Sequence, residues 1–123
     1  MGMRITPSIL NADFSQLDQE ISRIASVSDL LHLDVMDNVF VPNFTFDFDQ
    51  AAAIIASSPI PVDSHLMIAD VDRLAPAYAH AGSASVTIHA EASSAISATL
   101  RAIKSEGARA GLALKPGSSI EDY

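Results

Sequence analysis

The chain has 123 residues, 49% hydrophobic and 18% charged, which suits about one folded domain and excludes a disordered or low-complexity protein. Its 15 acidic residues outnumber 7 scattered basic ones and give a net charge of −8, so we expect neither a nucleic-acid nor a membrane partner. Cysteine is absent, which excludes disulfides, thiolate metal sites and cysteine nucleophiles.

Short β-rich runs alternate with helical patterns at a spacing of about 25 to 30 residues, the period of a βα unit. Strands are predicted over residues 5–10, 30–36, 62–67, 85–89 and 110–114. Helices are predicted over residues 13–25, 48–57, 71–81 and 93–106. Strands separated by helices indicate an α/β fold with a parallel sheet and right-handed crossovers.

Polar residues and glycines mark the helix boundaries. Side-chain oxygens suited to capping a first turn precede three of the helices: Asn11 or Asp13 the first, Asp70 the third, and Ser93 or Ser94 the fourth. Gly82 and Gly107 follow the third and fourth helices, where a left-handed residue is favoured.

The C-terminal segment predicts the start of one more helix. Ser118 followed by Glu121 is typical of a capping box, and the sequence ends one turn later, at Tyr123. A single terminal turn does not propagate stably by itself. We therefore expect a truncated chain with four complete βα units and a fifth just begun.

Polar side chains alternate with apolar ones on the second and third predicted strands. Side chains two apart share a face, which gives two rows: His32, Asp34 and Met36, then Asp63, His65 and Met67. If these strands are neighbours, His32, Asp34 and His65 converge near the carboxyl ends, where barrel active sites form. Two imidazoles and a carboxylate suit zinc, iron, manganese or cobalt. A structural His–Asp pair with a core histidine is the alternative, as is core packing for the two methionines.

Several motifs make the chain resemble the ribulose-phosphate 3-epimerase family. The segments are PSILNADF at 7–14, HLDVMD at 32–37, FVPNFTF at 40–46, HLMI at 65–68 and, more weakly, HAE at 89–91 and GLALKP at 111–116. The resemblance covers residues 5 to 116 but only the first half of the family's (β/α)8 barrel. It implies a TIM-barrel type α/β fold in which residues 1–123 form the N-terminal half of one ribulose-phosphate-binding barrel, with no second domain.

The resemblance also implies roles for individual residues. His32, Asp34 and His65 would be three of four protein ligands to one catalytic divalent metal, and Asp34 would be one of two acid/base carboxylates. Ser8 on the first strand would lie beside the substrate together with the two metal-binding histidines. Met36 and Met67 would form an apolar lining around the reaction centre.

The implied activity is that of a cytoplasmic isomerase of the pentose phosphate pathway. It would interconvert D-ribulose 5-phosphate and D-xylulose 5-phosphate by removing the C3 proton, stabilising an enediolate with the metal, and returning a proton from the opposite face. The family's second carboxylate, an Asp on the seventh strand, and its phosphate-binding loops have no counterpart here. We therefore expect the chain alone to bind metal weakly and to be almost inactive.

Two alternatives remain open from the sequence. One is a hexulose-phosphate 3-epimerase of the same superfamily, which the first half of a barrel does not distinguish from the pentulose enzyme. The other is a non-catalytic half-barrel. Open parallel edges of such a half-barrel favour self-association, so we expect a homo-oligomer.

Some polar residues of the matched region depart from the family or lack a motif. Asn38 and Asp47 stand where the family usually has Gly, and Asn tolerates a left-handed backbone better than most residues. Ser64 stands where an apolar residue is usual. We expect His80 to be an exposed helical residue and His89, at a strand end, to be structural rather than catalytic.

Overall fold

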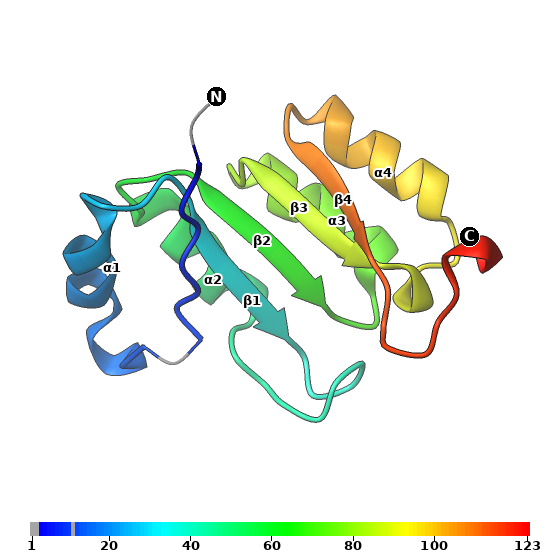
Figure 1. The fold of residues 1–123 in the computed structure, drawn as a ribbon, viewed down its shortest axis with the longest axis horizontal. Helices are drawn as coiled ribbons and strands as arrows, with labels where there is room; N and C mark the ends of the chain where they lie inside the picture. Colours follow the sequence, from blue (N-terminus) through cyan, green and yellow to red (C-terminus); the bar gives the residue numbers. More distant parts are fainter. Residues whose placement is uncertain (1–2, 11) are drawn as a thin grey trace.

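Four parallel strands form one sheet in chain order (Figure 1), in a computed structural model that describes residues 3–10 and 12–123. The strands are β1 (Leu31–Met36), β2 (Val62–Met67), β3 (Ser85–His89) and β4 (Arg109–Ala113). The α-helices are α1 (Leu17–Ala25), α2 (Phe48–Ser57), α3 (Val71–His80) and α4 (Ile96–Ser105). This confirms the predicted α/β fold, and consecutive strands side by side are the arrangement of a partial TIM barrel.

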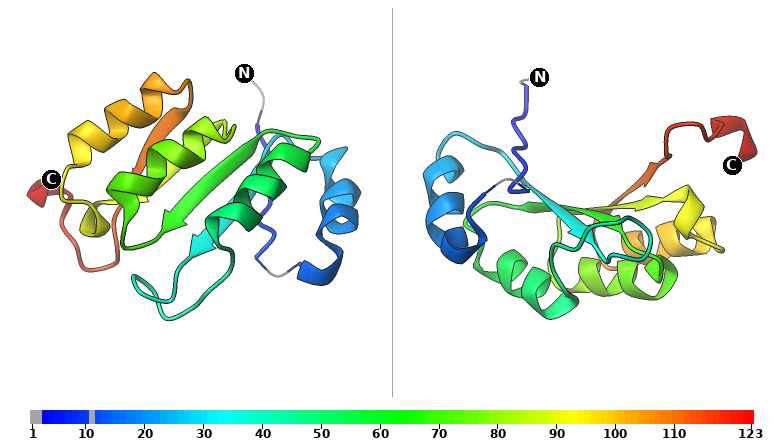
Figure 2. Two further views of the ribbon diagram at one scale, coloured as in Figure 1. Left: turned by 180° about the vertical axis from the view of Figure 1, so that it is seen from behind. Right: turned by 90° about the horizontal axis from the view of Figure 1, so that it is seen from below.

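The two faces of the sheet differ in what covers them. Helices α2, α3 and α4 lie together on one face (Figure 2). Leu31, Leu33 and Val35 of β1 pack into the core on this side and are at most 1% exposed. The intervening residues of β1 point to the opposite face, so the alternation in the sequence separates a helix-covered core from a polar row.

The helices are nine or ten residues long. At 1.5 Å per residue each measures about 15 Å, which suffices to cover one strand. Within residues 3–10 and 12–123, no helix has the length and apolar character needed to cross a membrane.

The first predicted strand, residues 5–10, is wrong as a regular strand. Only Ser8 forms a parallel bridge, with His32 of β1. The His32 amide donates to the Pro7 carbonyl at 2.8 Å, whereas the return bond from Ile9 to the His32 carbonyl is long, at 3.4 Å. Proline lacks an amide proton, which weakens any ladder at this position. The segment nevertheless runs alongside β1 (Figure 1), and its Ser8 hydroxyl reaches Asp34 on the polar face.

The first helix is divided. A 3-10 helix (Phe14–Gln16) precedes α1, and Asp13 caps it by accepting a hydrogen bond from the Ser15 amide at 3.0 Å. Gln16 has φ −133°, which interrupts the helical backbone before Leu17. Asp13 therefore caps the 3-10 helix with which the predicted helix begins. Asn11, the other predicted cap, lies outside the described residues.

The predicted caps of the third and fourth helices are wrong. Asp70 lies at the N-cap of α3, but its carboxylate pairs with Arg73 rather than with a backbone amide. The hydroxyls of Ser93 and Ser94 donate to Asp72 of α3, and α4 begins only after Ala95. Ser93 and Ser94 are therefore bound to a charged acceptor on the neighbouring helix, and the Ser93 hydroxyl accepts only from the Ala95 amide, at 3.1 Å, ahead of the first residue of α4.

Two departures from the family pattern have clear local roles. Asn38 adopts φ 58°, the left-handed conformation expected of it. Asp47 forms a full capping box with Gln50: its carboxylate accepts from the Gln50 amide at 2.7 Å, and the Gln50 side chain accepts from the Asp47 amide at 3.0 Å. Asp47 thus stabilises the first turn of α2.

The predicted glycine positions are confirmed, since Gly82 and Gly107 have φ 117° and 92° directly after the C-caps of α3 and α4. At the C-terminal segment a single 3-10 turn (Ile120–Asp122) forms. Ser119 caps it by accepting from the Glu121 amide, so the predicted cap at Ser118 is wrong by one residue.

The Asp47 capping box gives the first testable expectation. We expect Asp47→Ala to lower the free energy of unfolding by about 1 kcal/mol, because the Gln50 amide in the first turn of α2 loses its acceptor. Urea unfolding followed by circular dichroism measures this. Asp49→Ala, in the exposed first turn of the same helix, is the control. Equal losses for both variants would contradict a specific role for the box.

A second expectation concerns Asp72, which joins α3 to the start of α4. Its carboxylate accepts from the Ser94 amide at 2.9 Å and from the Thr99 hydroxyl at 2.7 Å, besides the two serine hydroxyls. Burial raises the pKa of Asp72, but these hydrogen bonds outweigh it and hold the pKa below its ordinary value.

A lowered pKa means that the Asp72 carboxylate stabilises the fold above about pH 4, the ordinary range of an unfolded Asp, and that this contribution is lost as the pH falls further. We expect Asp72→Asn to cost about 1 kcal/mol at pH 7, with the difference from wild type shrinking below pH 4. Urea unfolding at several pH values tests this, with Asp49→Asn as control. A difference that stays constant down to pH 3 would be inconsistent with it.

Candidate metal and catalytic site

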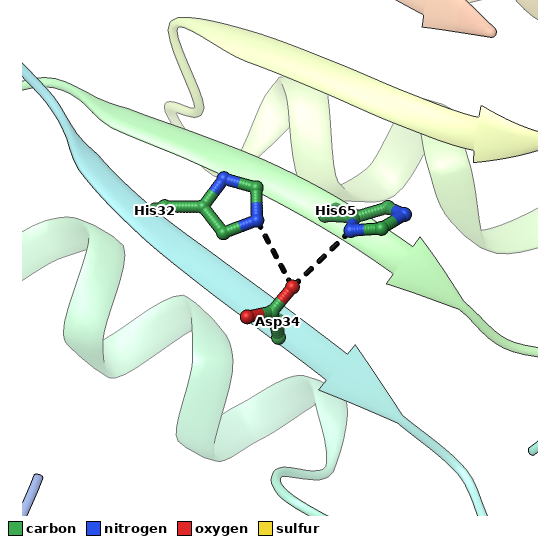
Figure 3. Close-up of side chains that lie close together, drawn as sticks. All are labelled: His32, Asp34 and His65. Atoms are coloured by element: carbon green, nitrogen blue, oxygen red, sulfur yellow. Dashed lines mark hydrogen bonds and ion pairs between the residues drawn. The ribbon is translucent and has the colours of Figure 1, made fainter. Parts of the chain in front are cut away.

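The register between β1 and β2 positions the central residues of the polar face. Asp34 is the direct cross-strand partner of His65, and His32 is the partner of Asp63. Neighbouring parallel strands lie about 4.8 Å apart, so such side chains meet. The predicted convergence of His32, Asp34 and His65 is therefore confirmed as geometry (Figure 3).

Asp34 lies at the centre of the cluster. Its Oδ1 atom is 3.0 Å from His32 Nε2 and 3.2 Å from His65 Nδ1. Its Oδ2 atom accepts a hydrogen bond from the Ser8 hydroxyl at 3.0 Å. Asp34 is only 9% exposed. One of its carboxylate oxygens therefore contacts the two imidazoles, and the other contacts the N-terminal segment.

The Asp34 carboxylate is strongly held in its ionised form. Burial raises the pKa of Asp34, but hydrogen bonds from the two imidazoles, the charge of His32 and the Ser8 hydroxyl together bring it far below its ordinary value. The side chain is therefore a permanent anion at neutral pH, available as a metal ligand or a proton acceptor.

His32 lies between two carboxylates. Its Nδ1 atom is 2.9 Å from Asp63 Oδ2, opposite the contact of Nε2 with Asp34. The hydrogen bond to Asp34, reinforced by that to Asp63, raises the pKa of His32 to about 10 against the opposing effect of burial. Asp63 is fixed in turn by the Ser85 hydroxyl, which donates to its Oδ1 at 2.7 Å. In the absence of a metal ion His32 is thus a cation.

The donor set fits a divalent metal ion. One ligand atom from each of His32, Asp34 and His65 lies within 4.8 Å of the others. Each imidazole presents one nitrogen to this point and has a hydrogen-bond partner on its other nitrogen, which is the usual arrangement around metal-binding histidines. Nitrogen and oxygen donors of this kind suit first-row transition metals.

The two methionines lie at the carboxyl ends of the strands. Met36 and Met67 are direct cross-strand partners on the same face as the cluster, and both are half-buried. The Thr45 hydroxyl links the end of β1 to the following loop, accepting from the Met36 amide and donating to the Asp34 carbonyl. Met36 and Met67 therefore form an apolar patch between the polar cluster and the loops that follow β1 and β2.

Ser64 points to the opposite, helix-covered face, where its hydroxyl lies 2.8 Å from that of Ser83. It is fully buried, so this pair explains how a polar residue is tolerated at a usually apolar position. Ser64 takes no part in the site.

The remaining histidines behave differently from each other. His80 is exposed and pairs with Glu106, as expected. His89, expected to be structural, reaches the cluster: its Nε2 atom lies 2.8 Å from His65 Nε2, and the planes of the two rings differ by 20°. The sequence pattern that could have indicated this is the alternation along β3, which puts His89 on the same face as Ser85, the hydrogen-bond partner of Asp63. Alternation along β2 likewise puts Asp63 on the face of His65.

The loop after β1 contacts the site at His89. The Phe40 ring lies 5.4 Å from the His89 ring, and the Lys115 ammonium group lies 3.8 Å above the Phe40 ring. Lys115 follows β4, so this contact joins the loop to the last strand and covers one side of His89.

Known proteins resemble this chain over nearly its whole length. The model of the ribulose-phosphate 3 epimerase family matches residues 4–123. The ribulose-phosphate 3-epimerase of Mycobacterium leprae is 47% identical over 123 residues, which are 100% of this chain and 54% of the relative. That of Bacillus subtilis is 39% identical over 120 residues, 97% of this chain and 55% of the relative.

A third relative, ribulose-phosphate 3-epimerase 1 of Cupriavidus necator, is 43% identical over 120 residues, 97% of this chain and 50% of the relative. The chain spans about half the length of the curated relatives it matches. Because the family model covers residues 4–123, this chain belongs to the ribulose-phosphate 3-epimerase family.

Proposed function

We propose that this chain supplies the first part of the active site of a metal-dependent ribulose-phosphate 3-epimerase, which interconverts D-ribulose 5-phosphate and D-xylulose 5-phosphate. The observation that carries the proposal is the convergence of His32, Asp34 and His65 on the polar face of a family member. The names of the relatives favour a pentulose over a hexulose phosphate. Residues 1–123 then form the N-terminal half of one barrel.

In this proposal His32, Asp34 and His65 hold one divalent metal, which is zinc, iron, manganese or cobalt by the chemistry of its donors. The metal supplies Lewis-acid stabilisation of the negative charge that develops on the substrate oxygens. Binding requires His32 to give up the proton that the two neighbouring carboxylates stabilise.

Asp34 is the acid/base group of this half. Its Oδ1 atom faces the imidazoles, which leaves Oδ2, oriented by the Ser8 hydroxyl, to take the proton from C3 of the ketose. Asp34 is ionised at neutral pH, as a proton acceptor must be. Ser8 therefore positions the base, while also lying where the substrate must approach.

Met36 and Met67 form the apolar lining beside this base. Thioether side chains carry no exchangeable proton, so they exclude water without competing for the C3 proton. Return of a proton from the other face requires a second carboxylate, which the family supplies from its seventh strand, beyond the part of the relatives that this chain covers.

Metal binding tests the ligand assignment. We expect the chain to bind Co²⁺ and Asp34→Asn to weaken that binding more than about tenfold, because an amide replaces the central anionic ligand. Isothermal titration at pH 7.5 measures the affinity. Asp49→Asn, which removes an exposed carboxylate of α2, is the control. Unchanged binding by Asp34→Asn would exclude this residue as a ligand.

Catalysis is tested in a chimera that joins this chain to the remaining residues of the Mycobacterium leprae relative. We expect the chimera to epimerise D-ribulose 5-phosphate and Asp34→Asn to lower kcat by about 10²- to 10⁴-fold, the usual contribution of an acid/base group. A coupled assay for D-xylulose 5-phosphate measures the rate, with Asp49→Asn as control. Full activity of the Asp34→Asn chimera would refute the assigned role.

A further inference from the structure

His89 contacts a candidate metal ligand from the neighbouring strand. Its ring meets that of His65 edge to edge, with the two Nε2 atoms 2.8 Å apart and the ring planes inclined by 20°. His89 is only 9% exposed, with Phe40 against its ring. A hydrogen bond between two buried imidazole nitrogens is possible only if one carries a proton and the other does not. The contact therefore couples the tautomers of His65 and His89.

The direction of this coupling follows from the candidate metal site. His65 presents Nδ1 to Asp34 and to the metal position, so Nδ1 must be unprotonated when a metal is bound. The proton of a neutral His65 is then on Nε2, which donates to Nε2 of His89. His89 must accept there and carry its own proton on Nδ1.

The surroundings of the outer nitrogen favour this tautomer. His89 Nδ1 and Glu91 Oε1 are both buried, lack hydrogen-bond partners among the described residues, and lie 3.6 Å from each other. The other oxygen of Glu91 accepts from the Lys115 amide at 3.1 Å, which fixes the carboxylate in place. A proton on Nδ1 thus points at an anchored negative charge.

We propose that His89, oriented by Glu91, is a positioning residue: by accepting from His65 Nε2 it favours the His65 tautomer whose Nδ1 is free for a divalent metal over the one whose Nδ1 donates to Asp34, and thereby raises the affinity of the site for the metal. The inference rests on the metal site of the proposed function and extends it to two residues outside the ligand set. Asp63 holds the tautomer of His32 in a corresponding way, from the opposite end of the cluster. The two ligand imidazoles then differ in their hydrogen-bond partners: His32 contacts a carboxylate directly, whereas His65 is linked to one through His89.

Co²⁺ titration of the 123-residue chain and three variants tests the proposal. His89→Phe keeps an aromatic ring but removes the acceptor nitrogen, and we expect about 10- to 100-fold weaker binding, the usual effect of losing a partner of a ligand histidine. His89→Gln places an amide oxygen where Nε2 lies, and we expect it to retain binding within a few-fold. His80→Phe, the same change at the exposed histidine, should bind as wild type.

The outcomes separate this inference from the proposed function. Failure of the wild-type chain to bind Co²⁺ would overturn the metal site itself. Binding by wild type and equal binding by folded His89→Phe would leave the metal site standing and overturn the role of His89. Circular dichroism melting of each variant establishes that it is folded.

A measurement on the unmodified chain decides the tautomers even if His89→Phe does not fold. Long-range ¹H–¹⁵N correlation spectra of the zinc-loaded chain report which imidazole nitrogen carries the proton. We expect a protonated Nε2 on His65 and a protonated Nδ1 on His89. A proton on Nε2 of His89 would overturn the proposal, because that nitrogen could then not accept from His65.

Discussion

The parallel register between β1 and β2 is the constraint on which the site depends. It sets Asp34 beside His65 and His32 beside Asp63, so both cross-strand pairs join an imidazole to a carboxylate. A slip of one residue would turn His65 toward the helices. The register is fixed from the other face, where Val62 and Leu66 of β2 are fully buried in the core. Packing on the helix-covered face thus determines which side chains meet on the polar face.

Charge balance on the polar face follows from the same arrangement. Two carboxylates, Asp34 and Asp63, flank one imidazole, and their hydrogen bonds raise the pKa of His32 to about 10. Without such pairing, burial of either carboxylate would be costly. The proton on His32 therefore offsets one of these two negative charges, and its replacement by a divalent cation would offset both.

Elements with strong alternation or helical periodicity could be predicted to the residue. Helix α2 and strands β2 and β3 have the predicted bounds, and the His32, Asp34 and His65 cluster follows from period-two alternation on two neighbouring strands. The start of α4 could not be predicted as well, because Ser93 and Ser94 donate to an acceptor on another helix and α4 begins only at Ile96.

The contact between His65 and His89 could not be predicted for a different reason. The direct partner of His65 on β3 is Thr87, so His89 reaches it diagonally, two residues further along. Diagonal contacts depend on rotamers and on the twist of the sheet rather than on pairing. The first segment likewise lacks a decisive pattern, since Pro7 interrupts the ladder that alternation would otherwise predict.

The contact between Lys115 and Phe40 links the two edges of the sheet. Three spacings of about 4.8 Å would separate β1 from β4 by about 14 Å in a flat sheet. Yet the loop after β1 meets the chain leaving β4 on the polar side, with the ammonium group 3.8 Å from the ring centre and 3.4 Å from the Phe40 carbonyl. Phe40 lies four residues beyond β1 and Lys115 two residues beyond β4, so the two segments and the lysine side chain are long enough to bridge this separation. A cation–aromatic pair thus links the chain leaving the first strand of the sheet to the chain leaving the last one, beside the buried His89 ring.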